Sequence, residues 1–459
     1  MFSRNIYQHL ESWKNRQHRK PLLIRGARQV GKTVAMLEFA KQHFHDTVYI
    51  NLEKVSDRNI FREVLRLPDL VQLLQLHSGK KLIPGDTILV IDEIQHSAIA
   101  MTQLRYFYEE MPDLHVLAAG SLLEVKLAQE GFSFPVGRVE YCYMHPVSFD
   151  EYLHAIQDEE TSRFISALDV QTPLPDATHE LLLKRYYDYV IVGGMPEAVA
   201  QYSAGQSFID LDTVYESLLT SYRDDVFKYA SQAKAVYLQH VLEHSPEYVG
   251  TRIKYEKFGG SGFRSREIRE AFDTLEKAMI LHRIPASLSL ELPVTLNHRK
   301  APKLAFLDTG LVNYQLGIRE NILTLSNLNM AYRGQIAEQI TAQTLRTLWS
   351  AREPRLAFWY RERKGSTAEV DYLLTHNQRL LPVEVKSGKV GRLKSLHKFM
   401  AESGQPLAIR VYSGKPELQT IALDQHSAYT LLSLPFYLLH RLFDISAEWF
   451  ASNLPSDSV

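Results

Sequence analysis

Short apolar runs alternate with stretches of helical periodicity over the first third of the chain. The runs fit buried strands and lie at residues 22–24, 47–52, 87–91 and 115–119. Strands that alternate with helices at this spacing predict an α/β architecture, a parallel sheet with helices on both faces. Ligands bind such sheets at the carboxyl ends of the strands.

A second pattern begins near residue 156. Helical spacing continues to residue 230, with an acidic, proline-containing break at 171–176, and predicts a helical connector. Two helices, over 236–242 and 264–277, are then followed by β-type runs at 281–284 and 304–307. This order predicts a winged helix-turn-helix.

The last third of the chain predicts another α/β unit. We expect helices over 331–348 and 429–442, and strands at 358–360, 369–374, 381–386 and 407–411. The polar turn at 376–378 should join two of these strands in a hairpin. The resulting domains are 1–155, 156–230, 231–310, 311–430 and 431–459.

Composition narrows the class of protein. The 459 residues are 45% hydrophobic with a net charge of −1, so no global field attracts nucleic acid or anionic lipid, and such binding would need local basic patches. The single cysteine, Cys142, excludes an internal disulfide and favours a reducing cytosolic setting. The charged amino terminus and the interruption of the last apolar stretch by His440 and Arg441 predict a cytoplasmic protein without a membrane span.

The strongest motif is the stretch GARQVGKT at residues 26–33, which fits the phosphate-binding pattern GxxxxGK[ST] between a strand and a helix. Its backbone amides and the positive end of the helix should cradle phosphate. Lys32 should reach the β and γ phosphates of ATP, and Thr33 should bind Mg²⁺. The expected ATP-binding residues are Gly26, Arg28, Gln29, Val30, Gly31, Lys32 and Thr33.

An acidic pair follows the third strand, in the sequence TILVIDE. Asp92 would hold Mg²⁺ through water, and Glu93 would orient and deprotonate the attacking water. The alternative, two acids that cap a surface edge, is weakened by the phosphate-binding motif upstream.

Two further residues are candidates for the catalytic machinery. Ser121 follows the fourth strand and either senses the γ-phosphate or caps the next helix. Arg138, at the expected start of a fifth strand, either stabilises the transition state, in cis or in trans, or is a surface arginine.

Five segments together carry a family resemblance: LLIRGARQVGKT, ILVIDEIQ, AAGSLLEV, Gly137-Arg138 followed by HPVSFDEY, and GGMPE at 193–197. The chain resembles the bacterial and archaeal AAA-type ATPases that carry an uncharacterised restriction-endonuclease-like domain at the carboxyl end. The resemblance implies a P-loop ATPase that uses ATP and Mg²⁺. GGMPE is specific to this family only, and in isolation it is a glycine-proline turn.

The last domain carries a second candidate chemistry. Alternation places Glu384 and Lys386 on one face of a strand, and Asp371 on the neighbouring strand can meet them. With Glu338 on an upstream helix, this arrangement is similar to the PD-(D/E)xK nuclease fold, although Val370 replaces the name-giving proline. Asp371, Glu384 and Glu338 would hold Mg²⁺ while Lys386 positions the attacking water. The alternative is a polar surface on an inherited fold.

Nucleic acid is the expected partner of such a site. Arg264, Arg266 and Arg269 would face DNA from a recognition helix, although interleaved glutamates also fit a solvated face. Basic residues flank the nuclease-like motif at 361–364 and 386–398. We therefore expect an ATP-hydrolysing protein that acts on nucleic acid with a Mg²⁺-dependent nuclease-like domain. The alternatives are an ATP-switched scaffold and a DNA-reading regulator, and the oligomeric state stays open.

Overall fold

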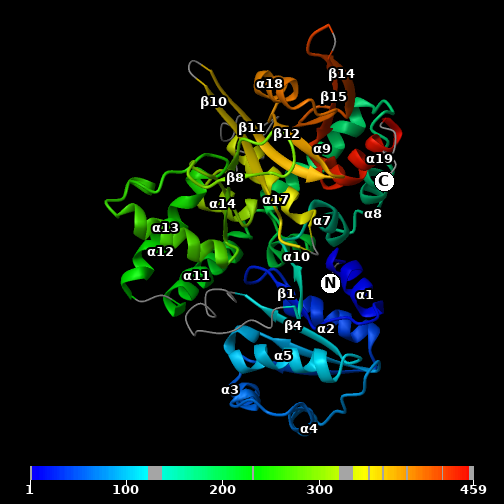
Figure 1. Ribbon diagram of the computed structural model, residues 1–459, viewed down its shortest axis with the longest axis vertical. Helices are drawn as coiled ribbons and strands as arrows, with labels where there is room; N and C mark the ends of the chain where they lie inside the picture. Colours follow the sequence, from blue (N-terminus) through cyan, green and yellow to red (C-terminus); the bar gives the residue numbers. More distant parts are fainter. Residues whose placement is uncertain are drawn as a thin grey trace.

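The computed structural model describes residues 3–121, 137–229, 232–319, 334–349, 352–363, 366–388, 391–425 and 427–453. Two sheets dominate it, and Figure 1 shows the five-stranded sheet at the bottom, the larger sheet at the top, and helices between them. None of the helices within these residues is long and apolar enough to cross a bilayer.

The amino-terminal sheet is parallel throughout, as predicted. Its strand order is β2-β3-β4-β1-β5. The strands are β1 (Leu22–Arg25), β2 (Asp46–Asn51), β3 (Thr87–Asp92), β4 (His115–Gly120) and β5 (Glu140–Tyr143). The fifth strand therefore begins at Glu140 and not at Arg138.

Helices cover both faces of this sheet because successive strand residues are apolar on both sides. Ile88 and Val90 of β3 pack in one core with Phe39, whereas Leu89 and Ile91 of the same strand pack in another. The helices are α1 (Ile6–Asn15), α2 (Lys32–His43), α3 (Val55–Arg58), α4 (Leu67–Ser78) and α5 (Ala98–Glu110), with 3₁₀ turns η1 (Asn59–Phe61) and η2 (Ile94–His96). Residues 60–70, which we expected to form one helix from their apolar spacing, are divided between η1 and the start of α4.

The connector is helical, as predicted. It follows α7 (Phe149–Ala155) and contains α8 (Glu159–Ala167), α9 (Asp176–Val192), α10 (Pro196–Ser203) and α11 (Asp212–Tyr229). The next segment holds α12 (Gln232–His244), η3 (Ser245–Tyr248), η4 (Phe258–Gly260), α13 (Ser265–Lys277) and the antiparallel strands β6 (Leu281–Ile284) and β9 (Lys303–Phe306). These helices and strands lie where the sequence placed them, and the winged-helix interpretation stays a prediction.

An eight-stranded mixed sheet forms the carboxyl-terminal part, in the order β14-β15-β13-β12-β11-β10-β7-β8. Its strands are β7 (Ala286–Ser287), β8 (Leu296–Asn297), β10 (Ala357–Arg363), β11 (Ser366–His376), β12 (Arg379–Val385), β13 (Leu407–Tyr412), β14 (Glu417–Ala422) and β15 (Ala428–Pro435). Around it lie α14 (Thr309–Gln315), α17 (Gln335–Thr347), α18 (Lys394–Ser403), η5 (Phe436–Arg441) and α19 (Leu442–Asn453).

One prediction in this region is wrong. The apolar stretch at 429–442 was expected to be a helix, but its first part is strand β15, paired with β13 and β14. A short continuous apolar run has no period that separates a buried strand from a buried helix. The boundary at residue 430 therefore falls inside a strand of the sheet. Of the other expectations, residues 331–333, Lys364, Lys389 and the tail 454–459 lie outside the described residues.

Candidate functional site

The phosphate-binding loop leaves the carboxyl end of β1 and enters α2. Gln29 and Gly31 hold positive φ angles of 64° and 97°, which wrap the backbone tightly. Lys32, the first residue of α2, donates from Nζ to the carbonyl oxygens of Gly26 (3.0 Å) and Ala27 (2.8 Å). Burial lowers the pKa of Lys32 to about 8. The ammonium thus lies inside the loop, where phosphate oxygens would compete for it.

The acidic strand end meets this loop. Thr33 donates from Oγ1 to Asp92 Oδ2 at 2.6 Å, and the Tyr49 hydroxyl donates to the same oxygen at 3.1 Å. A hydroxyl and a carboxylate held this close are the hard oxygen ligands that Mg²⁺ prefers. Thr33 and Asp92 therefore fit the expected Mg²⁺ site.

Glu93 lies one residue beyond the strand in a left-handed conformation, with φ of 51°. Non-glycine residues seldom adopt this conformation, and it is concentrated at functional sites. Gln95 donates from Nε2 to Glu93 Oε2 and also contacts Ser121 Oγ at 3.5 Å. Gln95 therefore joins the expected base to Ser121, a role that no sequence motif indicated.

Arg138 is not near this site. The backbone of β5 runs parallel to β1, with Glu140 beside Leu22, so Arg138 lies at the amino end of the sheet, opposite the phosphate-binding loop. Its Nε donates to Glu109 Oε1 at 2.8 Å. The structure thus contradicts a role for Arg138 in cis.

Arg4, which the sequence did not single out, contacts the loop from outside. The Arg4 guanidinium donates to the carbonyl oxygens of Val30 (3.0 Å) and His145 (2.7 Å), and it forms an ion pair with Glu151 at 3.1 Å. All three contacts join Arg4 to residues that are far from it in the sequence, at separations of 26 residues or more. Sequence patterns carry no signal for such pairs.

Helix α11 contacts the loop from the other side. Arg28 forms an ion pair with Asp225, and the Tyr222 hydroxyl donates to the Arg28 carbonyl oxygen at 3.1 Å. Gln29 Nε2 lies 3.4 Å from Ser221 Oγ. The nucleotide-binding loop is therefore in direct contact with the connector.

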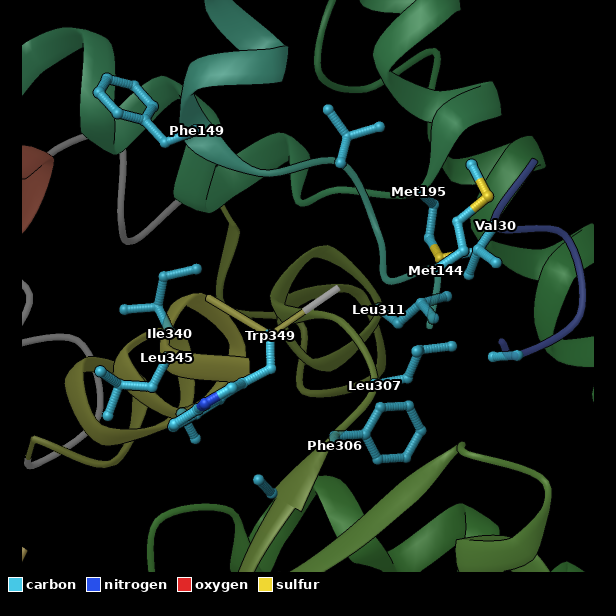
Figure 2. Close-up of a cluster of buried hydrophobic side chains, with 14 of the residues drawn as sticks. Val30, Met144, Phe149, Met195, Phe306, Leu307, Leu311, Ile340, Leu345 and Trp349 are labelled. Carbon is cyan, nitrogen blue, oxygen red and sulfur yellow. The ribbon is translucent and has the colours of Figure 1, made fainter. Parts of the chain in front are cut away.

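The GGMPE turn between α9 and α10 packs into the same region. Figure 2 shows the side chains of Met195, Met144 and the loop residue Val30 lying close together. The Gly194 backbone N–H donates to Asp308 Oδ2 at 2.5 Å, and the Gly194 carbonyl accepts from Val147 N at 2.7 Å. This turn thus joins the segment that follows β5 to the segment that follows β9.

The carboxyl-terminal cluster has an unexpected centre. Lys303, the first residue of β9, donates from Nζ to Glu338 Oε2, Glu369 Oε1 and Asp371 Oδ1, each at 2.9 Å. Its side chain is 3% exposed. Burial and the neighbouring Asp371 carboxylate raise the pKa of Glu338, which fits an excess of carboxylates around one ammonium.

The remaining motif residues form a second pair. The β11–β12 hairpin is present as predicted, with positive φ angles at Asn377 and Gln378 in its turn. Lys386 Nζ lies 2.6 Å from Glu384 Oε1, and Asp371 Oδ2 accepts from the Val385 backbone N–H at 2.8 Å. Lys386 therefore forms an ion pair with one oxygen of the Glu384 carboxylate.

This donor set does not fit the expected Mg²⁺ site of Glu338, Asp371 and Glu384. The space between Glu338 and Asp371 holds the Lys303 ammonium, and Glu384 is turned to Lys386. No group of three or more potential ligands within the described ranges is arranged to hold a metal ion. The sequence did not indicate Lys303. This residue lies on β9, whereas its partners lie on α17 and β11, 35 residues or more further along the chain.

Comparisons with known proteins cover three parts of the chain. Residues 18–153 match the family described as "AAA domain". Residues 183–322 and 333–433 match two families described as "Domain of unknown function", DUF8612 and DUF4143. No curated protein gives a significant match to the sequence.

Solved structures give remote similarities. Caenorhabditis elegans PCH-2 aligns with 12% identity over 45% of this chain and 65% of its own, with a TM-score of 0.28. The Thermotoga maritima RuvB Holliday junction branch migration motor aligns with 15% identity over 65% of this chain and 93% of its own, with a TM-score of 0.28. Aeropyrum pernix ORC1 in complex with DNA aligns with 15% identity over 70% of this chain and 90% of its own, with a TM-score of 0.26.

The amino-terminal unit is thus characterised independently by its parallel sheet, its phosphate-binding loop and its family match. The loop, Thr33 and Asp92 meet at the carboxyl edge of that sheet. Residues 18–153 are therefore similar to an AAA domain, and this similarity supports the assignment of the amino-terminal unit as an AAA-type ATPase.

Proposed function

We propose that this protein binds and hydrolyses ATP with Mg²⁺, and that the nucleotide state is transmitted to its helical connector. The observation that carries the proposal is the 2.6 Å contact between Thr33 and Asp92 beside the buried Lys32. It brings together, at one strand edge, the groups that phosphoryl transfer requires.

Each residue has a distinct task. Lys32 binds β- and γ-phosphate oxygens in place of the loop carbonyls, and Thr33 and Asp92 would hold Mg²⁺, which neutralises phosphate charge. Glu93 Oε accepts the proton of the attacking water, and Gln95 orients that carboxylate. Ser121 lies beyond Gln95, where it can report on the γ-phosphate.

The contacts of the loop favour a switch. Arg28 and Gln29 contact Asp225 and Ser221 of α11, and Val30 packs against the GGMPE turn. A change in loop conformation on ATP binding must therefore alter contacts with α11 and with the turn that precedes α10. This is the ATP-switched scaffold that the sequence left as an alternative.

Two variants test the ATPase. Lys32→Ala should abolish high-affinity ATP binding in isothermal titration, and Glu93→Gln should keep binding but lose turnover by about 10²-fold or more in a phosphate-release assay. Glu110→Gln, an exposed position at the end of α5, is the matched control. Parental turnover in Glu93→Gln would contradict the assignment of the base.

The Mg²⁺-dependent nuclease is not the function that the geometry favours, because Lys303 lies among the carboxylates that would hold the metal. Nucleic-acid binding by α13 is a second candidate. Arg264, Arg266 and Arg269 are exposed, although Arg266 is paired with Glu270 and Arg269 lies 4.9 Å from the Tyr255 ring. A cytoplasmic location also stays a prediction.

A salt series tests nucleic-acid binding by α13. Replacing the three arginines with alanine should weaken binding of a DNA duplex. It should also reduce the slope of log K against log salt by up to about 0.9 for each phosphate that an arginine no longer neutralises. Unchanged affinity and slope would leave α13 as a packing helix.

A further inference from the structure

The acidic cluster of the carboxyl-terminal domain is built around a lysine. Lys303 comes from β9, whereas its partners come from α17 (Glu338) and β11 (Glu369, Asp371). A lysine ammonium has three N–H donors, and the three 2.9 Å contacts use all of them. The group is therefore fully satisfied in its buried position.

The charges of this cluster are close to balance without any added ion. Four carboxylates, on Glu338, Glu369, Asp371 and Glu384, are met by three cations. The cations are Lys303, Lys386 at 2.6 Å from Glu384, and Arg252 at 3.6 Å from Glu369. Four partly buried carboxylates this close together need compensating positive charge, and Lys303, Lys386 and Arg252 supply most of it.

Moving the Lys303 side chain out of this position would destabilise the folded protein. Its side chain is 3% exposed, and its ammonium lies 5.6 Å from the Phe358 ring and 5.9 Å from the Tyr372 ring. Its backbone is held in β9, which pairs with β6. Moving the ammonium out would leave the partly buried carboxylates of Glu338 and Asp371 without their ion-pair partner, which is destabilising.

We infer that Lys303 is the resident counter-cation of this centre, that it replaces a divalent metal ion, and that the centre serves to anchor β9 to α17 and β11. The adjoining contacts fit an anchor. Gln339, next to Glu338, exchanges two hydrogen bonds with the Phe306 backbone at the other end of β9, at 2.8 and 2.9 Å. Beyond β9, Asp308 binds Gly194. The inference is independent of ATP hydrolysis.

The experiment measures Mn²⁺ binding and thermal unfolding of the full chain without nucleotide, in an Asp92→Asn background that removes the carboxylate of the ATPase site. With Lys303 present, Mn²⁺ should leave the unfolding temperature unchanged, and no bound Mn²⁺ should be seen by electron paramagnetic resonance. Lys303→Ala should lower the unfolding temperature, and Mn²⁺ should then raise it again, because a ligand of the native state stabilises that state.

Controls separate this effect from general destabilisation. Lys300→Ala removes a partly exposed lysine that is paired with Glu362, outside the acidic cluster, and should leave the Mn²⁺ response unchanged. Adding Asp371→Asn to Lys303→Ala should abolish the Mn²⁺ rescue. Tight Mn²⁺ binding by the protein that retains Lys303, lost in Asp371→Asn, would overturn the inference. That measurement does not require Lys303→Ala to fold, and it does not depend on the ATPase assay.

Discussion

Replacement of Gly194 by alanine should destabilise the protein strongly. A Cβ atom at this position would overlap the Val147 carbonyl oxygen and lie 2.9 Å from both Pro146 Cβ and Val147 N. Val147 N also donates to the Gly194 carbonyl at 2.7 Å, so the two backbones cannot separate without loss of that bond.

The expected loss of stability depends on which groups must move to make room for the Cβ atom. Inserting a methyl group into a packed site costs about 1–3 kcal/mol. If the turn shifts to relieve the overlap, the hydrogen bond from Gly194 N to the buried Asp308 carboxylate is lost, which adds about 1.5–3 kcal/mol for a bond to a charged group. We therefore expect a loss of about 3 kcal/mol or more.

The assay is urea unfolding followed by circular dichroism, with Gly262→Ala as the matched control. A Cβ atom at Gly262 meets nothing within 4 Å, and its φ angle is not positive, so this change should be neutral or slightly stabilising. If both variants unfolded at the parental urea concentration, the packing role assigned to the GGMPE turn would be wrong.

Three other variants test the contacts of the ATPase site and the buried aspartate. Asp225→Ala removes the ion-pair partner of Arg28 and should weaken ATP binding by about 1 kcal/mol, which is about a fivefold increase in Kd. Isothermal titration measures this change. Asp224→Ala, at the exposed neighbouring position, should leave the Kd unchanged. Burial raises the pKa of Asp308 to about 6, above its unfolded value near 3.8, so its contribution to stability is present below pH 3.8 and is lost as the pH rises to 6. Asp308→Asn should remove this loss of about 3 kcal/mol from the pH dependence of urea unfolding; the same slope in both proteins would contradict the assignment. Arg138→Ala should keep the parental rate of phosphate release, and a loss of about 10³-fold would reveal action in trans.

Much of the amino-terminal unit could be read from the sequence because its signals are local. The alternation of strands and helices predicted the parallel sheet, and the spacing of Gly26, Lys32 and Thr33 predicted a loop at a strand end. Parallel strands bring their carboxyl ends together, so Asp92 was expected beside Thr33, and the structure places them in contact. The β11–β12 hairpin was predicted for the same reason, since its pattern and turn are continuous in sequence.

Only the tertiary structure decided which charges meet. Arg138 has a strand-edge position in the sequence, but the parallel register with β1 places it at the opposite end from the loop. Lys303 lies in an apolar strand with no nearby motif, and folding brings it to three carboxylates from two other elements. Residue patterns report which face of an element is buried, whereas ion pairs between distant elements depend on packing geometry. For that reason the sequence determined the ATP-binding loop and the β11–β12 hairpin, and the tertiary structure determined which cation occupies the acidic centre of the carboxyl-terminal part.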